Sequence, residues 1–225
     1  MIAHRGVSAL ETENTAAAFV AAGNRSYYGV ETDIWRTLDG KFICNHDGNS
    51  GRICGQNLTM EQSTLPDLRE LTLNDLDGKA DRSDLKLCMP EEYFKICCHY
   101  GKVCIVELKS SFHMDEIQRI VEIFEGYLDQ TVFISFQMRN LELIKKLRPL
   151  QECQYLTSKY EEDLPRILAI KKMGVDIHYK ALTRERIDLF HRAGVEVNCW
   201  TVDDPHVAQM LIDSGVDYIT SNLLE

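Results

Sequence analysis

The stretch GVDIHYKALTRERIDLFHRAGVEVNCWTVDDPHVAQMLIDSGV, residues 174–216, contains one pattern twice and begins it a third time. Each unit opens on Gly-Val, continues through a short run rich in β-branched residues, and then shows apolar residues at helical spacing. The helical part of each unit ends at the next glycine, which is a common stop for a helix. The stretch therefore predicts strands that alternate with helices.

The same alternation extends toward both ends of the chain. It predicts helices over 14–23, 90–100, 114–127, 140–147, 163–174, 182–194 and 204–215, and strands near 2–4, 29–35, 103–109, 132–136, 153–157, 175–179, 195–202 and 216–220. Strands separated by helices pair in parallel through right-handed crossovers. Eight of them predict an α/β fold, a closed (β/α)8 TIM barrel. An open, doubly wound sheet is the alternative, but no strand is followed by a GxGxxG turn.

Two segments depart from this regular pattern. A long excursion over residues 41–89 separates the second strand from its helix, and loops of this length are usually functional or carry small elements of their own. After the last predicted strand only a few residues remain, which predicts a missing or truncated eighth helix. We therefore expect one TIM-barrel domain over residues 1–225, with an insertion over residues 48–89.

Composition excludes several classes of partner. The net charge of −10 argues against nucleic acid and against docking on an anionic membrane. No apolar run reaches the length of a membrane span, and no basic segment followed by an apolar run precedes His4. The eight cysteines form no CxxC pair, so we expect buried, reduced thiols and a cytoplasmic location, although a Cys44–Cys54 bridge stays open. The sequence does not indicate the oligomeric state.

Charged residues cluster where the predicted strands end. Glu31 and Asp33 lie two apart on the second strand, and Glu107 and Lys109 lie two apart on the third. Alternate residues of a strand point the same way, so each pair can face the barrel mouth. Three carboxylates suit a hard divalent cation such as Mg²⁺ or Ca²⁺. The alternatives are a solvated carboxylate pair on the second strand and a structural salt bridge on the third.

Two histidines and an arginine accompany these carboxylates. His4 and Arg5 follow the first predicted strand, at the barrel end where active sites are built, and His46 follows the FICN segment. Two imidazoles suit paired proton transfers, while a divalent cation with an arginine and a lysine suits a phosphate. The alternative for His46 is a structural role, because a lone histidine before Asp-Gly is more often a turn residue. Among the remaining histidines, His178 lies on a predicted strand. Together the residues favour metal-assisted cleavage of a phosphodiester, with Trp200 as an apolar wall.

The order and spacing of these motifs resemble the glycerophosphodiester phosphodiesterase family over residues 2–222. The resemblance rests on HRG at 4–6, ENT at 13–15, ETD at 31–33, HD at 46–47, ELK at 107–109, SF at 135–136 and WTV at 200–202. It implies a TIM barrel with an insertion after the second strand, and an enzyme of lipid and glycerol metabolism. It also implies hydrolysis of small-molecule glycerophosphodiesters to glycerol 3-phosphate and an alcohol, with a divalent cation.

The resemblance also implies a role for each site residue. Glu31, Asp33 and Glu107 would hold the metal, and His4 and His46 would act as base and acid. Arg5 and Lys109 would bind phosphate, and Trp200 would pack on the glycerol.

The chain departs from the family pattern in three places. Thr12 precedes ENT where proline is common, WTVD replaces the frequent WTVN, and TSN stands where the family often has TD. None of these touches the proposed metal or proton-transfer residues. Two other functions remain open: action on lysophospholipids in the manner of phospholipase D toxins, and a non-catalytic barrel that binds phosphate ligands. The polar insertion disfavours the first, and the full set of acid–base residues disfavours the second.

Overall fold

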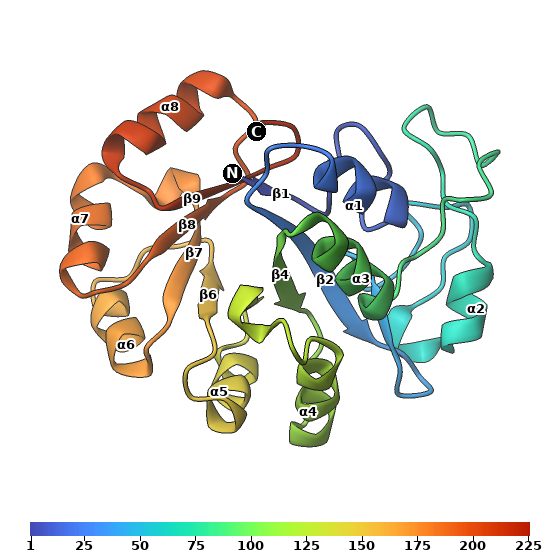
Figure 1. Cartoon of the computed structure of the whole chain (residues 1–225), viewed down its shortest axis with the longest axis horizontal. Helices are drawn as coiled ribbons and strands as arrows, with labels where there is room; N and C mark the ends of the chain where they lie inside the picture. Colours follow the sequence, from blue (N-terminus) through green and yellow to red (C-terminus); the bar gives the residue numbers. More distant parts are fainter.

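A computed structural model describes all 225 residues, and eight parallel strands close into a barrel (Figure 1). The barrel closes because β1 (Ile2–Ala3) pairs with both β2 (Gly29–Arg36) and β9 (Tyr218–Ser221). The wall between them is formed, in order from β2, by β4 (Val103–Leu108), β5 (Thr131–Ser135), β6 (Cys153–Thr157), β7 (Gly174–His178) and β8 (Val197–Trp200). The predicted (β/α)8 barrel is confirmed, and the open sheet is excluded.

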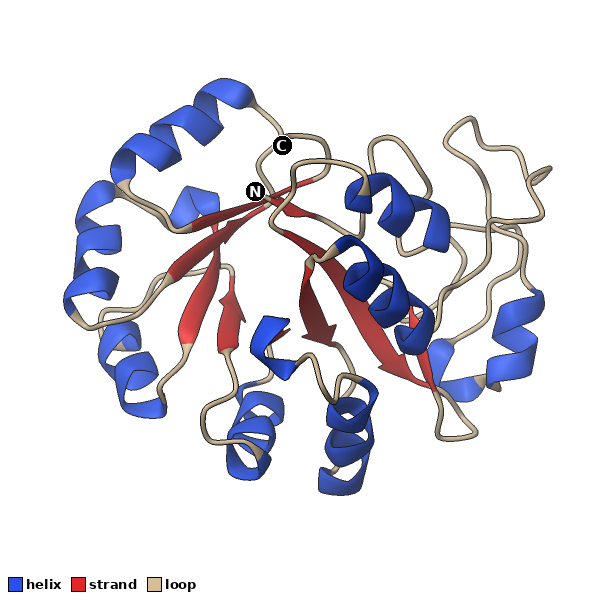
Figure 2. Ribbon diagram, viewed as in Figure 1, coloured by secondary structure: helices blue, strands red, loops and turns tan.

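Helices surround the barrel strands, one after each of the first seven (Figure 2). They are α1 (Ala16–Gly23), α3 (Pro90–Tyr100), α4 (Met114–Ile123), α5 (Met138–Leu147), α6 (Leu164–Lys171), α7 (Arg184–Arg192) and α8 (Pro205–Ser214). No helix follows β9 within residues 222–225, as the sequence predicts. None of the helices is both long and apolar enough to cross a membrane.

The helix ends follow the glycine pattern in part. Gly215 takes a left-handed conformation and ends α8, as expected. In α6 the left-handed residue is instead Lys172, and Gly174 already belongs to β7. Gly174 therefore opens a strand rather than closing a helix.

The long excursion forms a small unit of its own beside β2. Its strand β3 (Phe42–Cys44) pairs antiparallel with the end of β2, and a 3₁₀ turn (Met60–Gln62) and the short helix α2 (Leu65–Glu70) follow. Nine buried side chains pack together here, separately from the main core: Ile43, Ile53, Cys54, Met60, Leu68, Leu71, Leu73, Leu85 and Leu87.

The main core lies between the barrel and its helices, and a second apolar layer fills the barrel interior. The interior layer consists of Ile2, Val103, Ile105, Ile134 and Leu156. All eight cysteines are free thiols, and all but Cys98 are buried, so the predicted burial of the thiols holds for seven of them. Cys44 and Cys54 form no bridge.

Candidate active site

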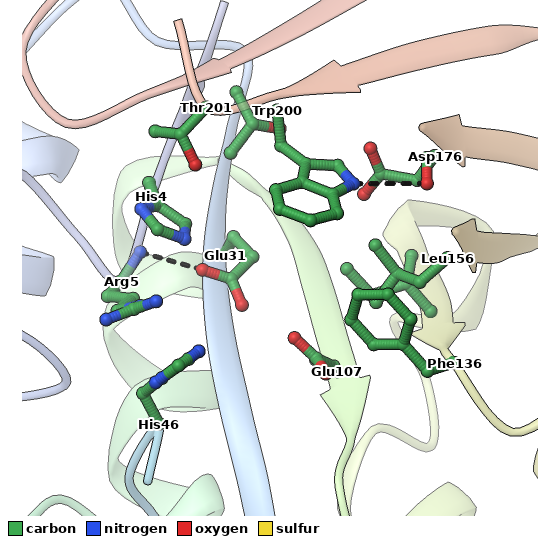
Figure 3. Close-up of a pocket in the computed structure, with 12 residues that line it drawn as sticks. His4, Arg5, Glu31, His46, Glu107, Phe136, Leu156, Asp176, Trp200 and Thr201 are labelled. Carbon is green, nitrogen blue, oxygen red and sulfur yellow. Dashed lines mark hydrogen bonds between the residues drawn. The ribbon is translucent and has the colours of Figure 1, made fainter. Parts of the chain in front are cut away.

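The carboxyl ends of the barrel strands surround a cavity of about 140 Å³ (Figure 3). Its walls are His4, Arg5, Glu31, His46, Glu107, Ile134, Phe136, Leu156, Asp176, Trp200, Thr201 and Thr220. These residues come from strands along the whole sequence, because each parallel strand delivers its last residues to the same end of the barrel. The cavity therefore brings together side chains that are far apart in the chain.

Three buried carboxylates meet on one side of this cavity. Glu31 and Asp33 lie on β2, and the parallel register sets Asp33 opposite Glu107 of β4. One oxygen of each of the three carboxylates lies within 4.8 Å of the others. Oxygen donors at this spacing are suited to a hard divalent cation. The three residues that the sequence predicts as ligands are therefore close enough to share one ion.

Asp33 has more hydrogen-bond and charge partners than the other two carboxylates. Its Oδ2 accepts a hydrogen bond from Asn14 Nδ2 at 2.8 Å and lies 3.7 Å from Arg5 Nε. Its Oδ1 lies 3.3 Å from Lys109 Nζ but, although fully buried, receives no hydrogen bond. Burial acts to raise the pKa of Asp33, but the charges of Lys109 and Arg5 outweigh it and hold this pKa below its usual range.

Glu31 and Glu107 have the opposite electrostatics. Burial, together with the charges of Asp33 and Glu107, raises the pKa of Glu31 well above its usual value, even though Arg5 N donates to its Oε2 at 2.8 Å. Burial and Asp33 likewise raise the pKa of Glu107 to about 8, despite the ion pair with Lys109 Nζ at 3.0 Å. Such a set is under-compensated by protein cations alone, and a divalent ion would supply the missing charge. The unbonded Asp33 Oδ1 and the all-oxygen donor set both fit this ion.

His4 is held in a defined orientation by Asn222. Its Nδ1 lies 2.7 Å from Asn222 Oδ1, while Asn222 Nδ2 donates to Asp203 Oδ2 at 2.6 Å. Because the Asp203 carboxylate only accepts, the amide is fixed with its oxygen toward the imidazole, which puts the proton on Nδ1 and leaves Nε2 with a lone pair. Burial and the neighbouring Arg5 lower the pKa of His4 to about 4, so this imidazole is neutral at pH 7.

His46 approaches the cavity from the loop after β3. Its Nδ1 bonds to Asp47 Oδ1 at 2.8 Å, and Asp47 Oδ2 accepts from Arg52 Nε at 2.6 Å. Arg52 also makes two hydrogen bonds of 2.7 Å to Glu13, which connects this loop to the segment after β1. Burial lowers the pKa of His46, while Asp33 acts to raise it. The two histidines thus lie on either side of Arg5 and Glu31 at the cavity (Figure 3). Each has an acceptor on Nδ1, Asn222 for His4 and Asp47 for His46.

An aromatic wall lies across the cavity from the histidines. Trp200 Nε1 donates to the backbone oxygen of Asp176 at 3.2 Å, and Phe136 packs edge-on against the indole at 5.8 Å between ring centroids. His178 contacts the same indole at 5.1 Å, but it does not line the cavity. Trp200 therefore forms part of the cavity wall, and His178 packs against its ring.

Sequence patterns alone indicate no role for Asn14, Asn222 or Asp176. Asn14 belongs to the ENT motif. The motif alone indicates no function for Asn14, which becomes clear only from its hydrogen bond to Asp33. Asn222 was visible only as part of a departure from the family pattern. Asp176 has the clearest missed signal, since it is an acid in the middle of an otherwise apolar strand. All three become recognisable through contacts between residues distant in the chain.

Comparison with known proteins agrees with this geometry. A glycerophosphodiester phosphodiesterase of Caldanaerobacter subterraneus subsp. tengcongensis is 27% identical over 99% of this chain and 93% of its own. A lysophospholipase D of Mus musculus is 28% identical over 66% of this chain and 40% of its own. The solved structure of an Oleispira antarctica phosphodiesterase, in complex with the product sn-glycerol-3-phosphate, superposes with a TM-score of 0.91 at 25% identity, covering 98% of this chain and 92% of that one.

The sequence model of the glycerophosphoryl diester phosphodiesterase family matches residues 4–224. That range includes every residue of the carboxylate cluster, both histidines and the aromatic wall. The chain therefore belongs to the glycerophosphoryl diester phosphodiesterase family.

Proposed function

We propose that this protein hydrolyses glycerophosphodiesters to glycerol 3-phosphate and an alcohol, with a divalent cation held by Glu31, Asp33 and Glu107. One observation carries the proposal: three buried carboxylates converge within 4.8 Å at a cavity that two histidines also line. A cation in this position would polarise a phosphoryl oxygen of the bound diester. Mg²⁺ and Ca²⁺ both match the all-oxygen donor set.

Arg5 and Lys109 are proposed to bind the phosphate. Both lie beside Asp33, Lys109 at 3.3 Å and Arg5 at 3.7 Å, so they bring positive charge to the edge of the carboxylate cluster. Charge-assisted hydrogen bonds from these two groups to phosphate oxygens would hold the reacting phosphorus near the cluster. Trp200 is proposed to pack against the glycerol carbons on the opposite wall.

His4 is proposed as the general base and His46 as the general acid. The neutral state of His4 and its free Nε2 suit proton abstraction at pH 7. His46 has the Asp47 carboxylate on its other nitrogen, which favours the protonated ring that a general acid needs. His46 lies in the loop after β3, whereas His4 follows β1. The two imidazoles therefore reach the cavity from different sides.

The nucleophile is proposed to be the substrate's own hydroxyl next to the phosphorylated carbon. Its attack forms a bond from that oxygen to phosphorus and breaks the bond from phosphorus to the leaving alcohol. His4 takes the hydroxyl proton, and His46 gives a proton to the alcohol. A well-oriented intramolecular attack can lower the barrier by about 7–11 kcal/mol. The cyclic glycerol phosphate that results is then opened by water or released.

A lysophospholipid is the second candidate substrate, because one relative is a lysophospholipase D. The experiment that tests the main proposal is turnover of glycerophosphocholine with added Mg²⁺ or Ca²⁺, with and without a chelator. Release of glycerol 3-phosphate that depends on the cation would support it. Cleavage of lysophosphatidylcholine alone would favour the second candidate, and no turnover of either would favour a phosphate-binding barrel.

The single-domain arrangement with an insertion over residues 48–89, and the cytoplasmic location, also stay predictions.

A further inference from the structure

Asp176 is a buried acid whose side chain has no ion-pair partner and whose Oδ1 receives no hydrogen bond. It lies on β7 with 2% of its surface exposed, and it lines the cavity beside Trp200 (Figure 3). Its Oδ1 is buried without any hydrogen-bond partner, and the Trp200 indole donates to its backbone oxygen and not to its side chain. A buried carboxyl oxygen without a partner is costly, so a ligand that supplies one gains affinity.

The charges around the cavity limit what this ligand group can be. Arg5 lies on the opposite wall, and Lys109 pairs with Asp33 and Glu107 of the carboxylate cluster, so the phosphate belongs on that side. Burial raises the pKa of Asp176 to about 8, and no neighbouring cation lowers it. A carboxyl that is mostly protonated at pH 7 can both donate to and accept from a neutral hydroxyl.

The depth of the cavity limits the ligand further. Leu156 stands opposite Asp176 in the sheet, and Leu156 and Ile134 line the same cavity as part of the apolar layer that also contains Ile105. The nearby amide of Asn198 is already bonded to Gln154 and Thr220. The cavity of about 140 Å³ has room for a short polar group beside Asp176 and is too small to hold a long acyl chain as well.

We propose that Asp176 binds the free terminal hydroxyl of the substrate's glycerol group and so selects deacylated glycerophosphodiesters over lysophospholipids. The inference rests on the proposed function and adds a determinant of substrate class. With phosphate beside Arg5 and Lys109, the hydroxyl next to the phosphorylated carbon is the nucleophile, and the terminal hydroxyl is the one left to reach the far wall. In a 1-acyl lysophospholipid this oxygen is esterified, so it has no proton to donate and carries an acyl chain.

A binding experiment without turnover tests the contact. The affinities of sn-glycerol 3-phosphate and of propane-1,2-diol 1-phosphate, which lacks only the terminal hydroxyl, are measured by calorimetry. We expect the first to bind wild type about tenfold more tightly, the usual effect of one buried hydrogen-bond partner. Asp176→Leu should abolish this difference by weakening glycerol 3-phosphate alone, and Asp176→Asn should keep most of it.

A matched variant separates this contact from a general disturbance of the barrel. Gln154→Leu also removes a buried polar side chain from the barrel interior, but Gln154 does not line the cavity, so it should preserve the tenfold preference. Equal affinity of wild type for the two ligands would overturn the proposal. So would an equal loss for both ligands in Asp176→Leu.

Turnover tests the selectivity. Asp176→Leu should raise KM for glycerophosphocholine about tenfold and narrow the preference over 1-acyl lysophosphatidylcholine. An unchanged ratio of kcat/KM between these two substrates would overturn the proposed selection. If wild type cleaves no glycerophosphodiester, the proposed function fails, and the calorimetric comparison still reports separately on the Asp176 contact.

Discussion

Asp33 and its two neighbouring carboxylates differ in how their charge is balanced. Asp33 has Lys109, Arg5 and the Asn14 amide around it, whereas the pKa values of Glu31 and Glu107 are raised by burial and by the charge of Asp33. In the absence of a cation, Glu107 therefore holds a proton near neutral pH, and ionisation of Glu31 is disfavoured in the same direction. This difference predicts that cation binding releases protons and strengthens as pH rises.

Removing a single ligand should greatly reduce catalysis. Glu31→Gln, Asp33→Asn and Glu107→Gln keep the side-chain shape but lower the charge of the cluster, and each should reduce kcat/KM at least about 100-fold. Excess cation should restore activity only in part. The control is Glu116→Gln, since Glu116 is also buried but pairs with Arg36 away from the cavity. Full activity of any cluster variant in chelator would disprove the assignment of the ligands.

The two histidines should give a bell-shaped dependence of kcat/KM on pH at saturating cation. The base must be neutral, so activity falls as pH drops through the pKa of His4, which lies near 4. The acid must be protonated, so activity falls as pH rises through the pKa of His46. His46→Ala should lose the alkaline limb and keep the acidic one. If kcat/KM of the wild type did not change with pH on either the acidic or the alkaline side, paired histidine catalysis would be contradicted.

The proposed nucleophile can be tested with a substrate variant. A diester that lacks the hydroxyl next to the phosphorylated carbon should still bind, because its phosphate and its terminal hydroxyl are intact. It should hardly turn over, because the intramolecular attack is lost. Steady-state rates for the two diesters, with binding measured as inhibition, give the comparison. Comparable rates would mean that water attacks directly.

At the level of elements, the sequence predicts the alternation well and the element ends less well. The strand over 153–157 matches its prediction, because turn residues bound it on both sides. The strand expected over 195–202 is only Val197–Trp200. Val195 N donates to Phe190 O at the end of α7 instead of to a strand, and Val202 N donates to Thr220 O beyond the last paired residue of β8. The β-propensity of a segment describes the preference of its own residues, whereas the extent of a strand also depends on hydrogen bonds to the adjacent strand.

In the site too, features that follow from local sequence patterns were predictable, and features that depend on contacts between distant residues were not. The common location of Glu31, Asp33, Glu107 and His4 was predictable, because they lie on or directly after neighbouring parallel strands that open at one barrel face. Asp176 and Asn222 were not assigned, because their roles depend on contacts across the barrel and between the two ends of the chain. A list of motifs cannot show that one buried acid lacks a partner.

The loop after β3 offers a test of how an element positions a catalytic group. Arg52 bonds Asp47 and Glu13 at once, and its side chain is 48% exposed, so its loss should cost little stability. Arg52→Ala should nevertheless lower kcat about tenfold with a smaller change in KM, because Asp47 and His46 lose their fixed geometry. Arg148→Ala removes a comparably exposed ion pair elsewhere and should leave kcat unchanged. An unchanged kcat in Arg52→Ala would show that the loop holds His46 without this bridge.

Considered as a whole, the molecule has a main apolar core, an apolar layer inside the barrel and a separate cluster in the insertion, with the charged site at the carboxyl end of the barrel strands. The barrel and helix packing and the insertion's own cluster stabilise the fold independently of the site. The carboxylate cluster opposes that stability, because it buries like charges together. Such strain is expected where a cation completes the charge balance.

This opposition makes the stability of the whole protein depend on pH and on cation together. In chelator, the folded state keeps protons on Glu107 up to about pH 8, whereas an unfolded glutamate loses its proton near 4.5. Between these values the folded state binds more protons than the unfolded state, so the free energy of unfolding falls as pH rises, by up to about 1.4 kcal/mol per pH unit for each such group. Bound Mg²⁺ or Ca²⁺ compensates the ionised carboxylates and should remove most of this loss.

Thermal unfolding at pH 6 and pH 8 should therefore show a Tm difference between cation and chelator that is larger at pH 8. Glu107→Gln should shrink that increase, because the titrating group is gone. A Tm difference that is equal at the two pH values would mean that the cluster does not bind the cation through these carboxylates.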